Sequence, residues 1–142
     1  MRVLLVRHGD AGDRGDWSGD DALRPLDERG RRQAEGLVEL LQTREVSRIC
    51  SSPYVRCAQT VEPLAIDRRL PVEHTMRLAE GASVDDVLAL LVELGTHASP
   101  LLSTHGDVVE ALLGHDSEKG SIWVIEHRGG KLAKLEYLGP PA

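Results

Sequence analysis

Short apolar segments alternate along the chain with longer segments of helical periodicity, and this alternation constrains the fold most. RVLLV at 2–6, VSRICSS at 46–52 and SPLLST at 99–104 are short and largely apolar. Such runs are typical of strands that are buried on both faces of a sheet. Strands that alternate with helices predict an α/β fold, a three-layer sandwich in which a mostly parallel central sheet carries helices on both faces.

The segments that follow the strands have helix signals at their ends. Asp27 and Ser83 are suitable N-cap residues, and Gly95 and Gly114 are suitable C-terminal stops. Pro63 is expected to kink or end the second helix, because proline donates no backbone hydrogen bond. The predicted helices cover residues 26–43, 54–65, 83–95 and 106–114.

The C-terminal part of the chain predicts a hairpin. SIWVIEH at 121–127 and KLAKLEYL at 131–138 flank the turn sequence RGG, as expected for two antiparallel strands that complete the sheet. The chain has 142 residues, which favours a single domain over residues 1–142. A domain of this size buries roughly two-thirds of its unfolded surface, which is enough for a core of its own.

The composition argues against several classes of partner. The net charge of −6 disfavours a nucleic acid polymer, because such a partner requires a basic face. Two cysteines form no disulfide framework and fit a reduced compartment. No apolar run approaches the roughly 18 residues of a membrane span. We therefore expect a cytoplasmic protein with no membrane partner. The spacings H-x-x-x-H and C-x-x-C are absent, so no metal or cofactor is predicted.

Two stretches run from an apolar strand into the dipeptide His-Gly. They are LLVRHG and LLSTHG, so His8 and His105 each follow a predicted strand, and a third predicted strand ends shortly before Arg56. In open α/β sheets, ligands bind at the carboxyl edge of the strands. If the three strands are neighbours, His8, His105, Arg7 and Arg56 meet in one pocket.

The residue types of this pocket favour a phosphorylated ligand. Arg7 and Arg56 offer planar guanidinium groups that match phosphate oxygens in pairs, and helix N-termini add backbone donors. A neutral imidazole is a competent nucleophile near neutral pH, and a second histidine held protonated beside a dianion stabilises the transferring oxygens. Phosphoryl transfer needs mainly positioning and electrostatic stabilisation, so a site rich in cations requires no metal.

CSSPYVR at 50–56 allows a second interpretation, because a cysteine and an arginine separated by five residues match the spacing of cysteine-dependent phosphatases. Such a loop turns successive N–H groups toward phosphate, usually with the help of glycines. The intervening residues include no glycine, and Pro53 has no N–H to donate. Cys50 ends an apolar strand, where a thiol is more often buried and inert. Cys50 as nucleophile is therefore the less favoured alternative.

Four motifs, in the expected order, resemble those of the histidine phosphatase superfamily, the phosphoglycerate-mutase-like proteins. They are LLVRHGDA, RPLDERGRRQAEGL, SSPYVRCAQT and STHGD, and they cover most of residues 3–110. The short chain and the RHGDA…RPL pattern are most similar to the SixA-like phosphohistidine phosphatases. The C-terminal segment also resembles the histidine phosphatase domain that is fused to Nudix hydrolases. The resemblance implies a phosphoglycerate-mutase-like fold and a metal-independent phosphatase, which is a hydrolase.

The resemblance also implies roles for individual residues. His8 is expected to be the nucleophile that becomes phosphorylated, and Arg7, Arg56 and His105 are expected to bind the phosphoryl group. Glu80, in the segment LAEG, matches the position from which family members supply a general acid. The alternative interpretation of Glu80 is a solvated loop carboxylate.

The sequence allows alternative roles for two further residues and more than one class of substrate. Arg24 matches the arginine of the RPL motif and is a further candidate phosphate contact, with a salt bridge inside its loop as the alternative. Ser52 either hydrogen-bonds near the phosphate or caps the following helix. The chain lacks the large insertions that enclose substrates in the mutases, which implies an open site. An open site suits phosphohistidine on a protein, or a small phosphorylated metabolite such as a nucleotide. A non-catalytic phosphate-binding module is the alternative function.

Overall fold

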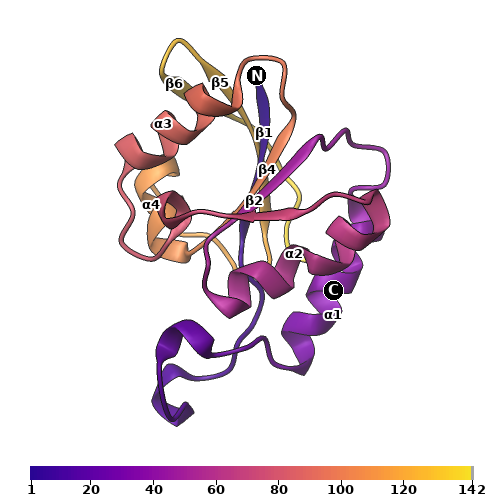
Figure 1. Ribbon diagram of the computed structural model, residues 1–142, viewed down its shortest axis with the longest axis vertical. Helices are drawn as coiled ribbons and strands as arrows, with labels where there is room; N and C mark the ends of the chain where they lie inside the picture. Colours follow the sequence, from indigo (N-terminus) through magenta and orange to yellow (C-terminus); the bar gives the residue numbers. More distant parts are fainter. Residues whose placement is uncertain (142) are drawn as a thin grey trace.

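The computed structural model describes residues 1–141 as a six-stranded sheet between two pairs of helices (Figure 1). The strands are β1 (Arg2–Arg7), β2 (Arg48–Ser51), β3 (Val72–His74), β4 (Pro100–Thr104), β5 (Ile122–Arg128) and β6 (Lys131–Tyr137). Their order across the sheet is β3-β2-β4-β1-β5-β6. Neighbours among β1 to β4 pair in parallel, whereas β5 runs antiparallel to β1 and to β6. The predicted α/β fold with a mostly parallel sheet and a terminal hairpin is confirmed.

The four helices cover the sheet in pairs (Figure 1). They are α1 (Glu28–Leu40), α2 (Val55–Arg68), α3 (Val84–Leu94) and α4 (Gly106–Leu113). α1 and α2 pack on one face, α3 and α4 on the other, so the sheet is the middle of three layers. The predicted N-caps are confirmed, because Asp27 accepts a hydrogen bond from the Gly30 N–H and Ser83 accepts one from the Asp86 N–H. None of the helices in residues 1–141 has the length and apolar character needed to cross a lipid bilayer.

Alternate residues of β1 supply the two halves of the core. Leu4 and Val6 belong to the cluster beneath α1 and α2, whereas Val3 and Leu5 belong to the cluster beneath α3 and α4. All four side chains are buried, because successive residues of a strand point to opposite faces and both faces of this strand are covered. The chain has no phenylalanine, and aliphatic side chains fill most of both clusters.

Two local features differ from the expectations. Pro63 was expected to kink or end α2, and it lies inside the helix without ending it, whereas the kink stays a prediction. Val61 and Leu64 on either side are fully buried, and burial of two such side chains, worth roughly 1.5–3 kcal/mol each, offsets the roughly 3 kcal/mol that an internal proline costs a helix. The short strand β3 was not predicted, because its three residues, partly or fully exposed at the sheet edge, carry little periodicity.

A long loop between β1 and α1 contains two short 3-10 helices, η1 (Arg14–Asp16) and η2 (Asp21–Leu23). Its two ends are joined, because the Asp27 N–H donates to the Asp10 carbonyl at 3.0 Å. The Gln33 side chain accepts from the Asp10 N–H at 2.8 Å. Gly30 of α1 packs so closely on the Asp10 carbonyl that a methyl group in its place would overlap the oxygen. The base of the loop is therefore fixed beside the C-terminal end of β1.

Replacing Gly30 with alanine should destabilise the fold, although alanine is normally the better helix former. The new methyl group would push the loop away from α1, and overpacking of this kind costs about 1–3 kcal/mol. Urea denaturation would measure the loss as a lower free energy of unfolding. Gly36→Ala is the matched control in the same helix, because its methyl group meets the side chain of Pro141 near the chain end. Equal effects of the two substitutions would contradict this account.

Candidate active site

The two histidines of the His-Gly dipeptides lie next to each other at the carboxyl edge of the sheet. His8 follows β1, His105 follows β4, and these strands are hydrogen-bonded neighbours. The centroids of the two imidazole rings are 5.5 Å apart. Both residues are buried, with exposed fractions of 7% for His8 and 2% for His105. The topology thus brings together two residues that are almost a hundred positions apart in the sequence.

The tautomer of His8 follows from its hydrogen bond. His8 Nδ1 lies 2.7 Å from the carbonyl oxygen of Gly9. Since a carbonyl only accepts, we assign the proton of the neutral ring to Nδ1, which leaves a lone pair on Nε2. Gly9 is itself held, because its N–H donates to Thr60 Oγ1 at 3.0 Å and the Thr60 hydroxyl donates to the Arg56 carbonyl at 2.7 Å. The His8 ring is therefore fixed relative to α2.

His105 is oriented by the segment that leads into α2. Its Nε2 lies 2.8 Å from Ser52 Oγ, and that hydroxyl oxygen also accepts from the Tyr54 N–H at 3.2 Å. The Tyr54 ring meets the His105 ring edge-on at 4.7 Å between centroids. Because this oxygen accepts from Tyr54, we assign the Ser52 hydroxyl proton to the bond with His105 Nε2, which puts the proton of the neutral ring on Nδ1. Nδ1 of His105 has no hydrogen-bond partner in the protein.

The two arginines predicted for the site reach it from different elements. Arg56 lies in the first turn of α2 and is only 1% exposed. Its Nη1 and Nη2 donate to the carbonyl and carboxylate oxygens of Asp21 at 2.8 and 3.0 Å. Arg7 ends β1, and its Nη1 donates to the Ser117 carbonyl. The Arg7 guanidinium lies against Gly106 at the start of α4, where a Cβ atom would be 2.7 Å from Cζ.

Buried donors without partners mark the site. Of the buried side-chain nitrogen and oxygen atoms in residues 1–141, five have no hydrogen-bond partner in the protein. Three of the five are Arg7 Nε, Arg56 Nε and His105 Nδ1. A buried polar group costs about 1–3 kcal/mol when it stays unsatisfied, so their concentration at one place indicates a site for an anion with several oxygens. The other two, on Trp123 and His127, belong to β5.

Both histidines are neutral in the free protein. Burial, followed by the charges of Arg56 and Arg7, lowers the pKa of His8 to about 3, although the hydrogen bond to Gly9 acts in the opposite direction. Burial and the charge of Arg56 lower the pKa of His105 to about 4. The expected protonated state of His105 is therefore not that of the free site, and a bound dianion would have to favour it by supplying the opposite charge.

The cysteines are unsuited to nucleophilic attack. Burial raises the pKa of the Cys50 thiol to about 11, and Cys50 belongs to the core cluster beneath α3 and α4. Burial also raises the pKa of the Cys57 thiol to about 12, although its sulfur lies 3.4 Å from His105 Nε2. A thiolate is the reactive form of cysteine, so these pKa values disfavour the cysteine alternative.

Two less certain candidates, Glu80 and Arg24, belong to the ion pairs around Arg56 and Asp21. Glu80 follows the short 3-10 helix η3 (Met76–Leu78), and its carboxylate lies 2.8 Å from Arg14 Nη2 and 3.7 Å from Arg56 Nη2. The Glu80 side chain is 35% exposed, at the rim of the site. Arg24 is buried and donates to the Ala11 carbonyl and to Asp21, which are contacts within its own loop. Its role as a phosphate contact stays a prediction.

A pocket of about 480 Å³ opens beside His8. The residues that line it come mainly from the β1–α1 loop: His8, Asp10, Gly12, Asp13, Arg14, Arg24, Asp27 and Lys119. It mixes carboxylates with basic groups. Among residues 1–141, no group of three or more histidine, cysteine or acidic side chains is arranged to hold a metal ion.

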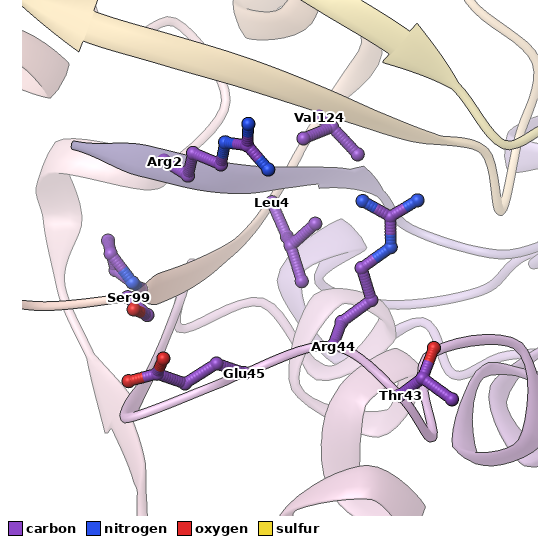
Figure 2. A pocket seen from close by; sticks show the side chains of 8 residues that line it. Arg2, Leu4, Thr43, Arg44, Glu45, Ser99 and Val124 are labelled. Carbon is purple, nitrogen blue, oxygen red and sulfur yellow. The ribbon is translucent and has the colours of Figure 1, made fainter.

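Another pocket, of about 470 Å³, lies at the opposite end of the sheet (Figure 2). Arg2 and Leu4 from the start of β1 and Ser99 and Pro100 from the start of β4 line it, together with residues 43–45 after α1. Its arginine Arg44 is already paired with Glu136 at 2.6 Å. The pocket contains neither of the paired histidines and none of the other predicted site residues.

Thr60, Tyr54 and Asp21 contact the site but were not predicted to do so. Thr60 was recoverable from the sequence, because it follows Arg56 by four residues and therefore lies on the same face of α2. Asp21 carries no such signal, since it lies in a loop without periodicity.

The fold and the site define a class of protein, an α/β domain that can hold an anion against a neutral histidine. The family model of the histidine phosphatase superfamily (branch 1) matches residues 3–85, more than half of the 142 residues. The chain belongs to this superfamily, as its motifs predicted.

Solved structures agree with this assignment. The protein histidine phosphatase SixA in complex with tungstate matches with a TM-score of 0.82 and 27% identity, over 98% of this chain and 97% of that one. The alpha-ribazole phosphatase of Shigella flexneri matches in fold, with a TM-score of 0.80 at 19% identity, over 98% of this chain and 96% of that one. The resemblance to the SixA-like phosphatases and the phosphoglycerate-mutase-like fold are confirmed.

A curated relative extends the comparison. The 8-oxo-(d)GTP phosphatase of Mycolicibacterium smegmatis is 38% identical over 155 residues, covering 98% of this chain and 48% of that protein. The chain thus spans about half the length of this relative. Family membership and the phosphatases among the relatives support the predicted enzyme class, a phosphatase.

The two site histidines should make the folded protein less stable as the pH falls below 6.5. Their folded pKa values of about 3 and 4 lie below the ordinary 6.5. Between pH 4 and 6.5 the unfolded chain therefore binds more protons than the folded chain, and the free energy of unfolding decreases as the pH falls. Each histidine contributes a slope of at most about 1.4 kcal/mol per pH unit. Urea denaturation at several pH values would measure it.

His8→Asn should reduce this slope, because it removes one of the two depressed pKa values. The exposed His97 provides the matched control, and His97→Asn should leave the slope unchanged. A slope that His8→Asn does not alter would show that His8 takes up a proton equally well in the folded and unfolded chain.

Proposed function

We propose that this domain is a phosphatase that works through a phosphohistidine intermediate on His8. The lone pair of His8 Nε2 attacks phosphorus, an N–P bond forms, and the bond from phosphorus to the leaving group breaks while the leaving group takes up a proton. Water then attacks phosphorus, the N–P bond breaks, and inorganic phosphate leaves. The observation that carries the proposal is the neutral His8, with Nδ1 bonded to the Gly9 carbonyl and three unpartnered buried donors close by.

The surrounding groups have complementary roles. Arg7 Nε, Arg56 Nε and His105 Nδ1 bind the phosphoryl oxygens and stabilise the charge that develops on them. Ser52 orients His105 through Nε2. The Gly9 carbonyl accepts from Nδ1 and so stabilises the positive ring that forms when Nε2 is phosphorylated. The attack therefore needs no proton to be removed from the nucleophile.

Glu80 is the proposed proton donor and acceptor. It lies at the rim of the site beside Arg56, where its carboxyl group can protonate a departing atom and later take the proton of the attacking water. In the free protein its carboxylate is paired with Arg14. Arg14 would have to release it when the substrate enters.

The substrate is a phosphorylated protein side chain or a small phosphorylated compound such as a nucleotide. Two relatives support this range, since one is named a protein histidine phosphatase and the other an 8-oxo-(d)GTP phosphatase. The pocket of about 480 Å³ beside His8 supports it as well, because it offers space next to the proposed nucleophile for more than the phosphoryl group. A screen of nucleoside diphosphates, phosphomonoesters and a phosphohistidine peptide would separate these substrates.

His8→Ala should abolish turnover of p-nitrophenyl phosphate while the protein stays folded. Loss of a nucleophile lowers kcat at least about a thousandfold. Cys50→Ser is the matched control and should keep activity, because the Cys50 thiol is buried and protonated. Retained turnover in His8→Ala would refute the mechanism.

Brief exposure to substrate, quenched in denaturant at neutral pH, should give an intact mass raised by one phosphoryl group. The adduct should be absent from His8→Ala. A protein that binds inorganic phosphate but yields neither turnover nor adduct would instead be a non-catalytic phosphate-binding module.

Glu80→Gln should slow substrates with poor leaving groups more than substrates with good ones. General acid catalysis typically contributes 10²–10⁴-fold, roughly in proportion to the help that the leaving group needs. We expect alkyl phosphates to lose far more of their rate than p-nitrophenyl phosphate. Glu62→Gln, at an exposed position of α2, is the control. Equal losses across a leaving-group series would exclude Glu80 as the acid.

A further inference from the structure

Asp21 of the β1–α1 loop contacts the buried Arg56 of the site through its carboxylate. Arg56 Nη1 donates to the Asp21 carbonyl oxygen at 2.8 Å, and Arg56 Nη2 donates to Asp21 Oδ2 at 3.0 Å. The Asp21 side chain is 29% exposed, whereas that of Arg56 is 1% exposed. Arg56 is therefore almost completely enclosed, and Asp21 covers its outer end.

Asp21 is itself held from the other side. Its Oδ1 accepts from Arg24 Nε at 2.9 Å, and the buried Arg24 is anchored by the Ala11 carbonyl at 2.7 Å. Arg14 Nη2 lies 3.5 Å from Asp21 Oδ2. Burial alone would raise the pKa of Asp21, but the hydrogen bonds from Arg24 and Arg56 and the charge of Arg14 hold it below its usual range. Asp21 thus stays ionised between two fixed guanidinium groups.

Because a guanidinium group is planar, contacts at both of its Nη atoms also fix the direction of its Nε–H bond. Arg56 Nε is the one nitrogen of this group that is buried without a partner. The charge of Arg56 lowers the pKa of both His8 and His105, so the group lies close to both rings.

We propose that Asp21 is a positioning residue of the phosphate site, which holds both Nη atoms of Arg56 so that its Nε–H is the donor presented to the phosphoryl group. Asp21 does not touch the substrate. The inference rests on the proposed function, because it assigns Arg56 to phosphoryl binding. It also makes the loop between β1 and α1 a structural part of the catalytic site.

Simple electrostatics predicts that Asp21 weakens anion binding, whereas the proposal predicts that Asp21 strengthens it. The proposal is therefore easy to test. A carboxylate beside an anion site repels the anion, so removal of its charge alone should strengthen anion binding. If Asp21 positions Arg56, removal should weaken binding, because the guanidinium loses the contact that fixes its direction. The sign of the change in affinity separates the two roles.

The experiment measures the affinity of tungstate, a tetrahedral dianion, by calorimetry, together with kcat and KM for p-nitrophenyl phosphate. Asp21→Asn keeps the shape of the side chain but presents an amide N–H₂ to one of the two arginines. We expect the dissociation constant of tungstate to rise about tenfold, since misplacement of a binding group by about 1 Å can cost as much as a hundredfold. We expect kcat/KM to fall by a similar factor while the melting temperature changes by no more than a few degrees.

Asp16→Asn is the matched control, because it removes the same charge from the same loop at an exposed residue of η1. Its tungstate affinity and kcat/KM should stay within about twofold of the wild type, as is usual for surface substitutions away from any specific contact. Unchanged or tighter tungstate binding in Asp21→Asn would overturn the proposal.

A second variant keeps the test decisive if Asp21→Asn does not fold. Asp21→Glu retains the charge but moves the carboxylate, so tungstate binding should still weaken at least about threefold by the same misplacement argument. An affinity equal to that of the wild type would overturn the proposal. Failure of the proposed function is a separate result. In that case the wild-type protein binds tungstate without turnover, and the comparison of affinities still decides the role of Asp21.

Discussion

Buried N–H donors without protein partners are the feature on which the rest of this site depends. Arg7, Arg56 and His105 each contribute one, and each unsatisfied group costs about 1–3 kcal/mol. That cost is a sizeable part of the roughly 5–15 kcal/mol by which a domain of ordinary stability is folded. The fold sustains it through two aliphatic core clusters, one on each side of the sheet. An anion that satisfies all three donors would therefore bind and stabilise the protein at the same time.

The same desolvation sets the protonation state of His8, the proposed nucleophile. Burial is the largest cause of the low pKa of His8 and of His105, and the charge of Arg56 lowers both. The neutral His8 keeps the lone pair that attack on phosphorus requires. A dianion placed among these groups would oppose the arginine charge and make a proton on His105 less costly. Substrate binding and activation of the second histidine are thereby coupled through one electrostatic environment.

The site residues that could be predicted from the sequence are those positioned by strands and helices. His8 and His105 follow short apolar strands, and the parallel pairing of β1 with β4 is what brings them together. Arg56 was recoverable because it begins the helix after β2. The partners of Arg56 were not recoverable, since Asp21 lies in a loop that has no periodicity and whose path depends on single side-chain contacts. Pro63 does not end α2 for a related reason, because tertiary burial of its neighbours outweighs the local preference.

The β1–α1 loop has a base that is fixed beside β1 and an outer part that contacts charged residues of the site. Its base is fixed by the contacts of Asp10 with Asp27 and Gln33, next to the strand that carries His8. Its outer part holds Arg56 through Asp21 and Glu80 through Arg14. In the proposed mechanism, substitutions in the outer part would therefore alter the contacts of Arg56 with the phosphoryl group and of Glu80 with the leaving group. The positions of the two histidines would not change.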